Sequence, residues 1–126
     1  SYGSLWTDGI GPCLAIALYA PEIKKGALAH ISGVRCSGLV PEAVYSENIV
    51  NTLILKLGSH QSLEAALAGE DHTDTEMSDL VKQKLSYFRI PILGEDLGTF
   101  GSSRRRDAYL HCQTGELQVY RYPPLF

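Results

Sequence analysis

The sequence predicts one α/β domain of the α+β kind, a layered sandwich with a mixed, largely antiparallel β-sheet core and two main helices packed outside it. Three observations predict this class: apolar segments with a period of two, two segments with apolar residues at helical spacing, and short turns rich in glycine or proline between them. The 126 residues are enough to bury a hydrophobic core without metal ions or disulfides. We therefore assign residues 1–126 to a single domain, since no repeat, low-complexity tract or linker interrupts them.

The N-terminal segment predicts a short strand followed by a turn. The strand ends with residues 5–7, and residues 8–12 follow with two glycines and a proline. Glycine adopts positive φ angles without steric cost, so a turn is expected here.

A β-hairpin is predicted next. In residues 13–20 larger apolar residues alternate with alanines, a pattern typical of a strand buried by large residues on one face and closely packed on the other. Residues 21–26 form the connecting loop, and residues 27–31 the second strand. Because the loop is short, the two strands are expected to be antiparallel. Cys13 and His30 are then placed as cross-strand neighbours, which makes contact between them geometrically reasonable.

A helix and a further strand follow. The helix starts at Pro41 and Glu42, because proline is tolerated in the first turn and an acidic residue there is favoured by the helix dipole. It ends before Gly58. Its apolar residues recur at helical spacing and are expected to cover the sheet: Val44, Ile49, Leu53, Ile54 and Leu57. Residues 62–68 alternate loosely, which predicts a strand.

A second helix is predicted after an acidic turn at residues 69–72. Thr73 or Asp74 is expected to cap it, because both side chains can accept a hydrogen bond from a free backbone N–H in the first turn. Its apolar residues lie on one face: Met77, Leu80, Val81 and Leu85.

The C-terminal part predicts short strands and turns. Strands are expected at residues 90–93 and 108–111, separated by a polar, glycine-rich loop at 94–103. Residues 113–115 then form a hairpin connection into a last strand at 117–120.

The charge and hydropathy patterns exclude several classes of function. The net charge is −3 at pH 7, and positive charge clusters only in residues 104–106, which we interpret as a solvated loop. No nucleic-acid partner is therefore expected. No apolar segment approaches the roughly 20 residues that a membrane-spanning helix needs, so we expect a soluble protein without membrane insertion.

The cysteines indicate the cellular compartment. There are three, an odd number at scattered positions without a secretory signal, which indicates free thiols in a reducing, cytoplasmic setting. The chain begins at Ser1 without a methionine, which leaves open whether an N-terminal piece has been removed.

The segment around Cys13 has the features of a reactive thiol. Cys13 follows a turn that contains Gly11 and Pro12, and glycine-rich turns expose backbone N–H groups that stabilise a thiolate or an oxyanion. The candidate oxyanion donors are the backbone N–H groups near Gly11 and Cys13. His30 stands at the end of the next apolar segment, where an imidazole can accept the thiol proton and later return it to a leaving group.

These residues also have simpler explanations. A single cysteine at the start of a strand is more often a small buried hydrophobic residue than a nucleophile. We interpret Cys36 and Cys112 as plain thiols, His72 as a solvated residue and His111 as a residue on a strand face. The sequence has no closely spaced set of metal ligands, and neither a metal nor another cofactor is expected.

In combination, these segments resemble a known family. Thr7, Cys13 and His30 occur at the spacing of the signature of the chemoreceptor glutamine deamidase (CheD) family. The likeness continues at residues 90–98, which resemble a closing strand and Glu-Asp-x-Gly loop of that family, and at residues 114–119, which resemble its Thr-Gly hairpin. The resemblance spans nearly the whole chain.

The resemblance implies a cysteine hydrolase that converts glutamine to glutamate in the cytoplasmic helices of chemoreceptors and releases ammonia. Cys13 matches the nucleophile, His30 the general base, and Thr7 a third residue that holds the imidazole through its hydroxyl or its backbone carbonyl. The Cys–His arrangement is also similar to that of the cytotoxic necrotizing factor toxins, which deamidate a glutamine of small GTPases. Docking to the chemotaxis phosphatase CheC occurs in the family, so CheC is a possible partner.

Two alternatives stay open at this point. One is a catalytically weak or inactive module that acts by binding a partner in chemotaxis signalling. It would be favoured if Pro12, which stands where the family commonly has serine and has no backbone N–H to donate, impairs the site. The other is a toxin-like deamidase of another host protein. The natural substrate, the oligomeric state and methyl-ester hydrolysis in place of deamidation are equally open.

Overall fold

The computed structural model of the chain describes residues 3–10, 14–31, 42–58, 61–69, 76–97 and 105–122. The elements in these residues are, in chain order, β1 Ser4–Ile10, β2 Leu14–Ala20, β3 Lys25–Ile31, α1 Glu42–Leu57, β4 Glu64–Gly69, α2 Glu76–Tyr87, β5 Ile92–Leu97, β6 Arg105–His111 and β7 Leu117–Tyr122.

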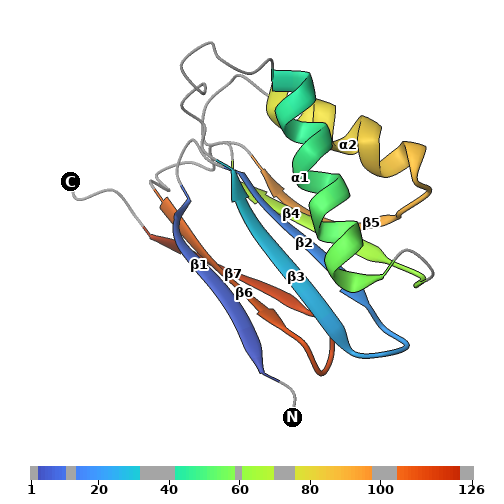
Figure 1. Cartoon of the computed structure of the whole chain (residues 1–126). Helices are drawn as coiled ribbons and strands as arrows, with labels where there is room; N and C mark the ends of the chain where they lie inside the picture. The colour runs from blue at the N-terminus through green and yellow to red at the C-terminus, as the bar shows by residue number, and fades with distance from the viewer. Residues whose placement is uncertain are drawn as a thin grey trace.

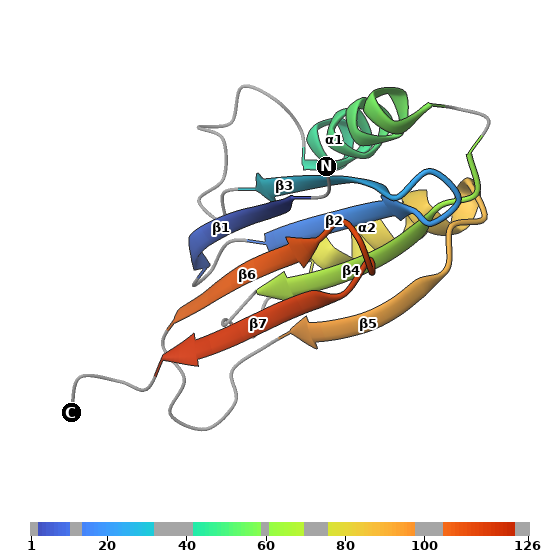
Figure 2. The ribbon, with the colours of Figure 1, turned by 90° about the horizontal axis from the view of Figure 1, so that it is seen from below.

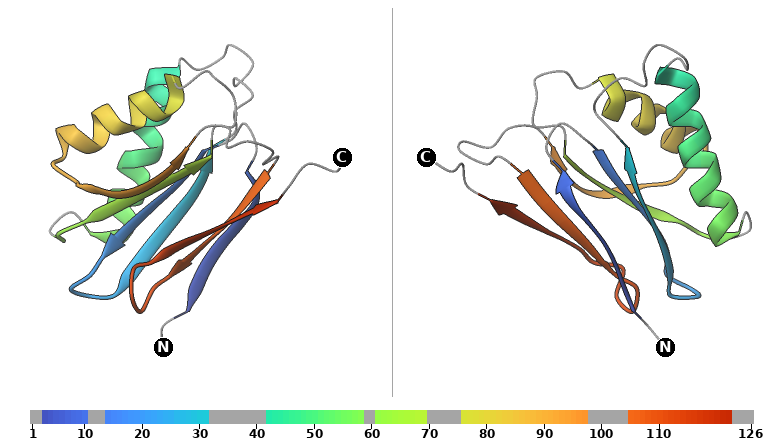
Figure 3. Two further views of the ribbon diagram at one scale, coloured as in Figure 1. Left: turned by 180° about the vertical axis from the view of Figure 1, so that it is seen from behind. Right: turned by 60° about the vertical axis from the view of Figure 1, so that its left-hand side comes forward.

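The strands form two sheets that lie face to face. A four-stranded sheet has the order β3-β2-β4-β5, and a three-stranded sheet has the order β1-β6-β7. All neighbouring pairs are antiparallel except β4 and β5, which are parallel. Helices α1 and α2 lie together on one face of the four-stranded sheet, and the three-stranded sheet lies on its other face (Figures 1 and 3). The predicted α+β sandwich with a mixed, largely antiparallel core and two outer helices is therefore confirmed.

The central strand β2 is buried on both faces, as its alternation of large and small residues predicts. Leu14, Ile16 and Leu18 belong to the hydrophobic core that this sheet shares with the helices. Ala15 belongs to a second, smaller core between the two sheets, which also contains Ala68 and Ala108. Large side chains therefore fill the space under the helices, whereas the buried cluster between the sheets is made of three alanines with Leu28, Leu117 and Val119 packed against it.

The two helices are held by their apolar faces. Val50, Leu53 and Leu57 of α1 and Val81 and Leu85 of α2 are buried in the helix-side core. Helix α1 ends as predicted at Gly58, which has a φ of 100° and donates its N–H to the carbonyl oxygen of Ile54 at 2.9 Å. The predicted caps Thr73 and Asp74 lie outside the described residues.

The turn between β6 and β7 is pressed against the other sheet. Gly115 has a φ of 79°, and a Cβ atom at this position would lie 2.4 Å from the Tyr19 ring. Tyr19 of β2 donates its phenolic O–H to the carbonyl oxygen of Cys112. The ring is therefore held by this hydrogen bond as well as by its contact with the turn. Glycine is required here by the backbone conformation and by the close approach. Figure 2 shows this turn beside β2 and β4.

Several predicted turns and loops belong to strands. Residues 8–10 continue β1, because β6 offers them a partner strand. Residues 94–97 continue β5 beside β4, although Gly94 and the acidic residues after it have the composition of a loop. Residues 25 and 26 open β3. In each case pairing with a neighbouring strand decides the local conformation, a contribution that short-range sequence patterns do not contain.

Helix α1 has 16 residues and helix α2 has 12. Within the part of the chain that the structure describes, neither helix has the length and hydropathy needed to cross a membrane.

Candidate active site

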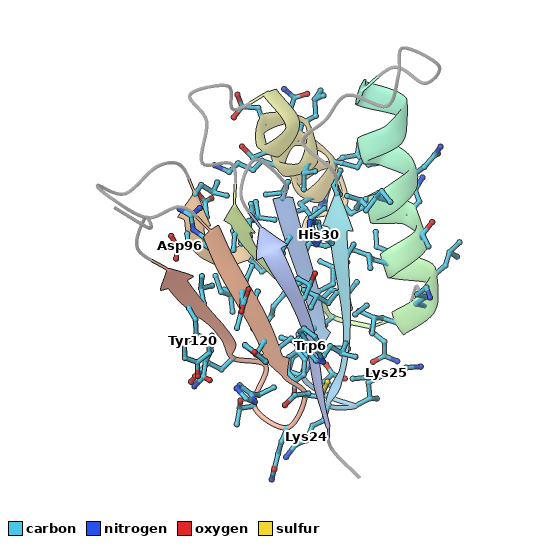
Figure 4. The ribbon with its side chains drawn as sticks, turned by 90° about the vertical axis from the view of Figure 1, so that its left-hand side faces the viewer. Trp6, Lys24, Lys25, His30, Asp96 and Tyr120 are labelled. Carbon is cyan, nitrogen blue, oxygen red and sulfur yellow. The ribbon has the colours of Figure 1, made fainter. Side chains whose placement is uncertain are left out.

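Thr7 and His30 meet between the two sheets. The hydroxyl oxygen of Thr7, on β1, lies 2.7 Å from Nδ1 of His30, on β3. Thr7 is half-buried and the His30 side chain is exposed, so the imidazole reaches solvent at the side of the sandwich. The sequence predicts that Thr7 holds the imidazole through its hydroxyl or its carbonyl, and the structure selects the hydroxyl. Figure 4 shows His30 between β1 and β3.

The neighbouring positions on each sheet are alanines. Thr7 is in register with Ala108 on β6, and His30 is in register with Ala15 on β2. Both alanines are fully buried between the sheets. Because an alanine side chain is short, the space next to Thr7 and His30 stays free for the imidazole and the threonine hydroxyl to meet.

Strand β1 changes register directly after Thr7. Between Thr7 and Ile10 it advances by three residues while β6 advances by two, from Ala108 to Arg106. This extra residue is a β-bulge, a feature that bends a strand and re-aims its residues, and that is frequent next to active sites. The chain thus leaves β1 with an altered twist just before the segment that contains Cys13.

The hairpin of β2 and β3 pairs the residue that follows Cys13 with the residue that follows His30. Strand β2 begins at Leu14, the residue that follows Cys13, and Leu14 pairs with Ile31, the residue that follows His30. The predicted antiparallel hairpin is confirmed, with Ala15 rather than Cys13 directly opposite His30. Cys13 and Gly11 themselves lie outside the described residues, as do Cys36 and His72.

The contact between Thr7 and His30 is compatible with two protonation patterns of the ring. If Nδ1 carries the proton, it donates to the threonine oxygen and Nε2 is free to accept a proton. If Nε2 carries the proton, the threonine hydroxyl donates to Nδ1. The first pattern is the one a general base needs.

The other histidine of the described residues has a different environment. His111 lies on the outer side of the three-stranded sheet, where Nδ1 is 3.0 Å from the Ser4 hydroxyl and Nε2 is 2.9 Å from Oε1 of Gln118. The prediction that His111 lies on a strand face is confirmed. Cys112, a free and half-buried thiol, follows it at the end of the same strand.

Sequence reasoning missed two buried charged residues of β6, Arg106 and Asp107. Arg106, in the arginine cluster interpreted as a solvated loop, lies on β6 and is 0% exposed. Its Nε atom is 3.4 Å from Oδ1 of Asp96 on β5. That interpretation of the arginine cluster is therefore wrong for Arg106. The alternation of Arg106, Ala108 and Leu110 along one face of a strand is the pattern from which its burial could have been inferred.

Two further observations concern where the protein could bind a ligand or a metal ion. A groove of about 570 Å³ lies between β4, β5 and the turn before β7, and neither Thr7 nor His30 is among its lining residues. Within the described ranges, no group of three or more histidine, cysteine, aspartate or glutamate side chains is arranged to hold a metal ion.

Comparison with known proteins identifies the family, although no family model matches the chain. A chemoreceptor glutamine deamidase CheD from Thermotoga maritima is 30% identical over 130 residues, which cover 93% of this chain and 81% of the relative. The CheD of Bacillus subtilis is 30% identical over 134 residues, 86% of this chain and 80% of the relative. A probable chemoreceptor glutamine deamidase CheD from Thermococcus kodakarensis is 30% identical over 135 residues, 93% of this chain and 82% of the relative.

The chain belongs to the CheD family. The family that Thr7, Cys13 and His30 indicate by their spacing is thereby confirmed, and it is a family of proteins named as glutamine-deamidating enzymes. Of the three CheD site residues predicted from the sequence, the structure joins Thr7 to His30. The catalytic roles of all three, and of the backbone N–H groups near Gly11 and Cys13, stay predictions.

Proposed function

We propose that this CheD-family protein deamidates glutamine side chains in the cytoplasmic helices of chemoreceptors, through a thioester on Cys13. The observation that carries the proposal is the 2.7 Å contact between Thr7 and His30, across two sheets, beside the strand that begins directly after Cys13. A histidine oriented by a third group and placed near a cysteine is the general pattern of an activated nucleophile. The proposed substrate places the activity in the cytoplasm.

The hairpin register supports contact between Cys13 and His30. His30 pairs with Ala15, two residues after Cys13. Positions related diagonally across an antiparallel strand pair have Cα atoms about 7–8 Å apart, within reach of long or aromatic side chains. The proposal that the His30 imidazole takes the Cys13 proton rests on this general spacing and on the chain continuing from β2 directly to Cys13.

The first half of the reaction forms the thioester. Nε2 of His30 takes the thiol proton while Nδ1–H donates to the Thr7 hydroxyl, and the Cys13 sulfur attacks the carboxamide carbon of glutamine. Backbone N–H groups near Gly11 and Cys13 stabilise the negative charge that develops on the carbonyl oxygen, and Pro12 between them contributes no donor. The imidazolium then gives its proton to the departing nitrogen, which leaves as ammonia.

The second half releases glutamate. The same imidazole takes a proton from water, and the resulting hydroxide attacks the thioester carbon. The carbon–sulfur bond breaks, the sulfur recovers the proton from His30, and the side chain leaves as a carboxylic acid, which loses its proton to solvent and becomes a carboxylate. The reaction consumes one water and yields one ammonia, so it needs no metal or redox cofactor.

The direct test measures ammonia together with the mass increase that accompanies conversion of an amide to an acid. The substrate is a helical fragment of a chemoreceptor that carries glutamines, and the enzymes are the wild type, Cys13→Ala, Cys36→Ala and Cys112→Ala. We expect the wild type and the last two variants to release ammonia and convert glutamine, and Cys13→Ala to do neither. Equal activity of Cys13→Ala and wild type would contradict the proposal.

A second test needs no substrate. A thiol activated by an imidazole and backbone donors is alkylated near neutral pH much faster than an ordinary thiol. We expect peptide mapping after brief iodoacetamide treatment to find label on Cys13 before Cys36 or Cys112. Equally slow labelling of all three would argue against an activated nucleophile.

The same measurements distinguish the alternatives. A folded wild type that converts neither the receptor helix nor small GTPases, but co-elutes with CheC, would indicate a module that acts by partner binding. Conversion of a small GTPase without conversion of the receptor helix would indicate a toxin-like deamidase. Pro12→Ser, which restores a backbone N–H beside Cys13, is expected to raise activity if the missing donor limits the reaction.

A further inference from the structure

Two sequence motifs that the proposed chemistry does not use meet in one contact, between a buried arginine and a half-buried aspartate. Asp96 comes from the Glu-Asp pair in β5, and Arg106 comes from the arginine cluster at the start of β6. The Arg106 side chain is 1% exposed and that of Asp96 is 16% exposed. Since β5 and β6 belong to different sheets, the contact between Nε of Arg106 and Oδ1 of Asp96 joins the two layers of the sandwich.

This ion pair lies level with the contact between Thr7 and His30. In the four-stranded sheet, Asp96 is in register with Ala68, Ala68 with Ala15, and Ala15 with His30. At about 4.8 Å per strand the row spans roughly 14 Å. Figure 4 shows Asp96 and His30 at similar heights along the strands, on opposite sides of the sandwich.

In the three-stranded sheet, Arg106 lies near Thr7 but in a neighbouring register row. Arg106 is in register with Ile10, and Ala108, two residues further along β6, is in register with Thr7. Arg106 therefore lies beside the end of β1 at which the bulge follows Thr7 and the chain continues toward Cys13. Asp96 thus shares a register row with His30, and Arg106 lies two residues along β6 from the residue that pairs with Thr7.

Stability is a weak reason for burying such a pair. Taking two charges out of water is costly, and a well-packed apolar pair of similar volume is often as stable or more so. A contact between a guanidinium and a carboxylate is directional, however, so it constrains how the two elements that it joins lie relative to each other. The neighbouring pair of Lys82 and Glu95, at 3.0 Å, is more than one-third exposed on both sides and has no such position between the sheets.

We propose that Arg106 and Asp96 are positioning residues for the active site. Their contact sets the separation and register of the two sheets at the level where Thr7 must reach His30, and it supports the end of β1 that leads to Cys13. The inference rests on the proposed function only where activity is the readout, because the state of the His30 ring can be measured without substrate.

The test compares four variants with the wild type. In the double variant Arg106→Met with Asp96→Leu, apolar contacts replace the charges, and Arg106→Lys keeps the charge without the planar guanidinium. Thr7→Val serves as the reference for a His30 ring without its partner. Glu95→Gln is the matched control, because it removes the carboxylate next to Asp96 in sequence without touching the buried pair.

The first readout is the ¹⁵N NMR spectrum of the His30 ring nitrogens, which reports the hydrogen bond at Nδ1. We expect the apolar double variant to fold with an unfolding midpoint at or above that of the wild type, yet to give His30 signals like those of Thr7→Val. Arg106→Lys is expected to give intermediate signals, and Glu95→Gln signals like those of the wild type. A wild-type His30 spectrum in both the double variant and Arg106→Lys would overturn the proposal.

The second readout is deamidation kinetics. We expect kcat of the double variant to fall about tenfold or more with little change in KM, because misplacement of reacting groups by about 1 Å can cost about 10²-fold. If the double variant does not fold, Arg106→Lys alone is compared with the wild type, both in the His30 spectrum and in the deamidation kinetics. If the wild type has no deamidase activity, the proposed function fails while the His30 spectra still decide whether the ion pair positions the ring.

Discussion

The hydroxyl oxygen of Thr7 and the Nδ1 atom of His30 lie 2.7 Å apart, although the two residues are 23 positions apart in the chain and belong to different sheets. A hydrogen bond of this kind forms only when both sheets are complete and correctly stacked. The bond is therefore a local indicator of how the whole sandwich is assembled.

Removal of the Thr7 hydroxyl is expected to slow catalysis without unfolding the protein. In Thr7→Val the side chain keeps its shape but no longer orients the imidazole, and kcat should fall about tenfold to hundredfold, part of the contribution of a positioned base. Thr7→Ser should retain most of the activity. Thr52→Val is the matched control, because Thr52 donates its hydroxyl to the Asn48 carbonyl within α1, away from the site. Steady-state kinetics with a receptor helix would show the difference, and equal rates for Thr7→Val and Thr52→Val would contradict it.

Replacement of the two described histidines should have opposite consequences. His30→Gln is expected to lower kcat by about a hundredfold or more, since it removes the general base. His111→Gln should leave activity intact, because His111 bonds Ser4 and Gln118 on the outer side of the three-stranded sheet. Glutamine conversion followed by mass spectrometry separates the two, and a comparable loss in both variants would argue against the assignment.

The turn before β7 should be intolerant of a side chain. In Gly115→Ala the new methyl group would meet the ring of Tyr19, which cannot move aside because it is 5% exposed and bonded to Cys112. We expect a loss of about 1–3 kcal/mol in the free energy of unfolding. Gly94→Ala is the control, since a Cβ there meets nothing within 4 Å. Urea denaturation measures both, and a stability of Gly115→Ala equal to that of Gly94→Ala would show that the contact is relieved.

Leucines in the core under the helices should contribute more to the free energy of unfolding than exposed leucines do. Leu85 of α2 is 0% exposed, and Leu85→Ala is expected to lower the free energy of unfolding by about 2–5 kcal/mol. Leu55 of α1 is 76% exposed, and Leu55→Ala should change it by about 0.5 kcal/mol or less. Deamidation per folded molecule should be unchanged in both, since neither residue approaches Thr7 or His30. Denaturant titration combined with initial rates would detect a departure from either expectation.

Features that depend on local pattern could be predicted from the sequence. The hairpin of β2 and β3 follows from alternating hydrophobicity and a short connection, and the end of α1 follows from Gly58. The likeness to the CheD family rests on the order and spacing of Thr7, Cys13 and His30, which are sequence properties. The choice of the threonine hydroxyl over its carbonyl needed coordinates, because that choice depends on the direction of one side chain.

Features that depend on distant partners could not be predicted in this way. Residues 94–97 look like a loop, but they form a strand because β4 offers its free edge. Arg106 looks like part of a solvated cluster, but it is buried on β6 and contacts Asp96 of the opposite sheet. In both cases the deciding neighbour is another part of the chain that short-range periodicity does not reveal.

The alanines between the sheets have a consequence for how this protein can vary. Ala15 and Ala108 flank His30 and Thr7, and their short side chains let the layers approach each other. Stacked sheets typically lie about 10 Å apart, and each added methylene group between them would widen that gap. Many residues together determine the separation of the two sheets. The hydrogen bond between Thr7 and His30 tolerates a change of only a few tenths of an ångström in that separation. Sequence drift at Ala15 and Ala108 is therefore confined to small residues.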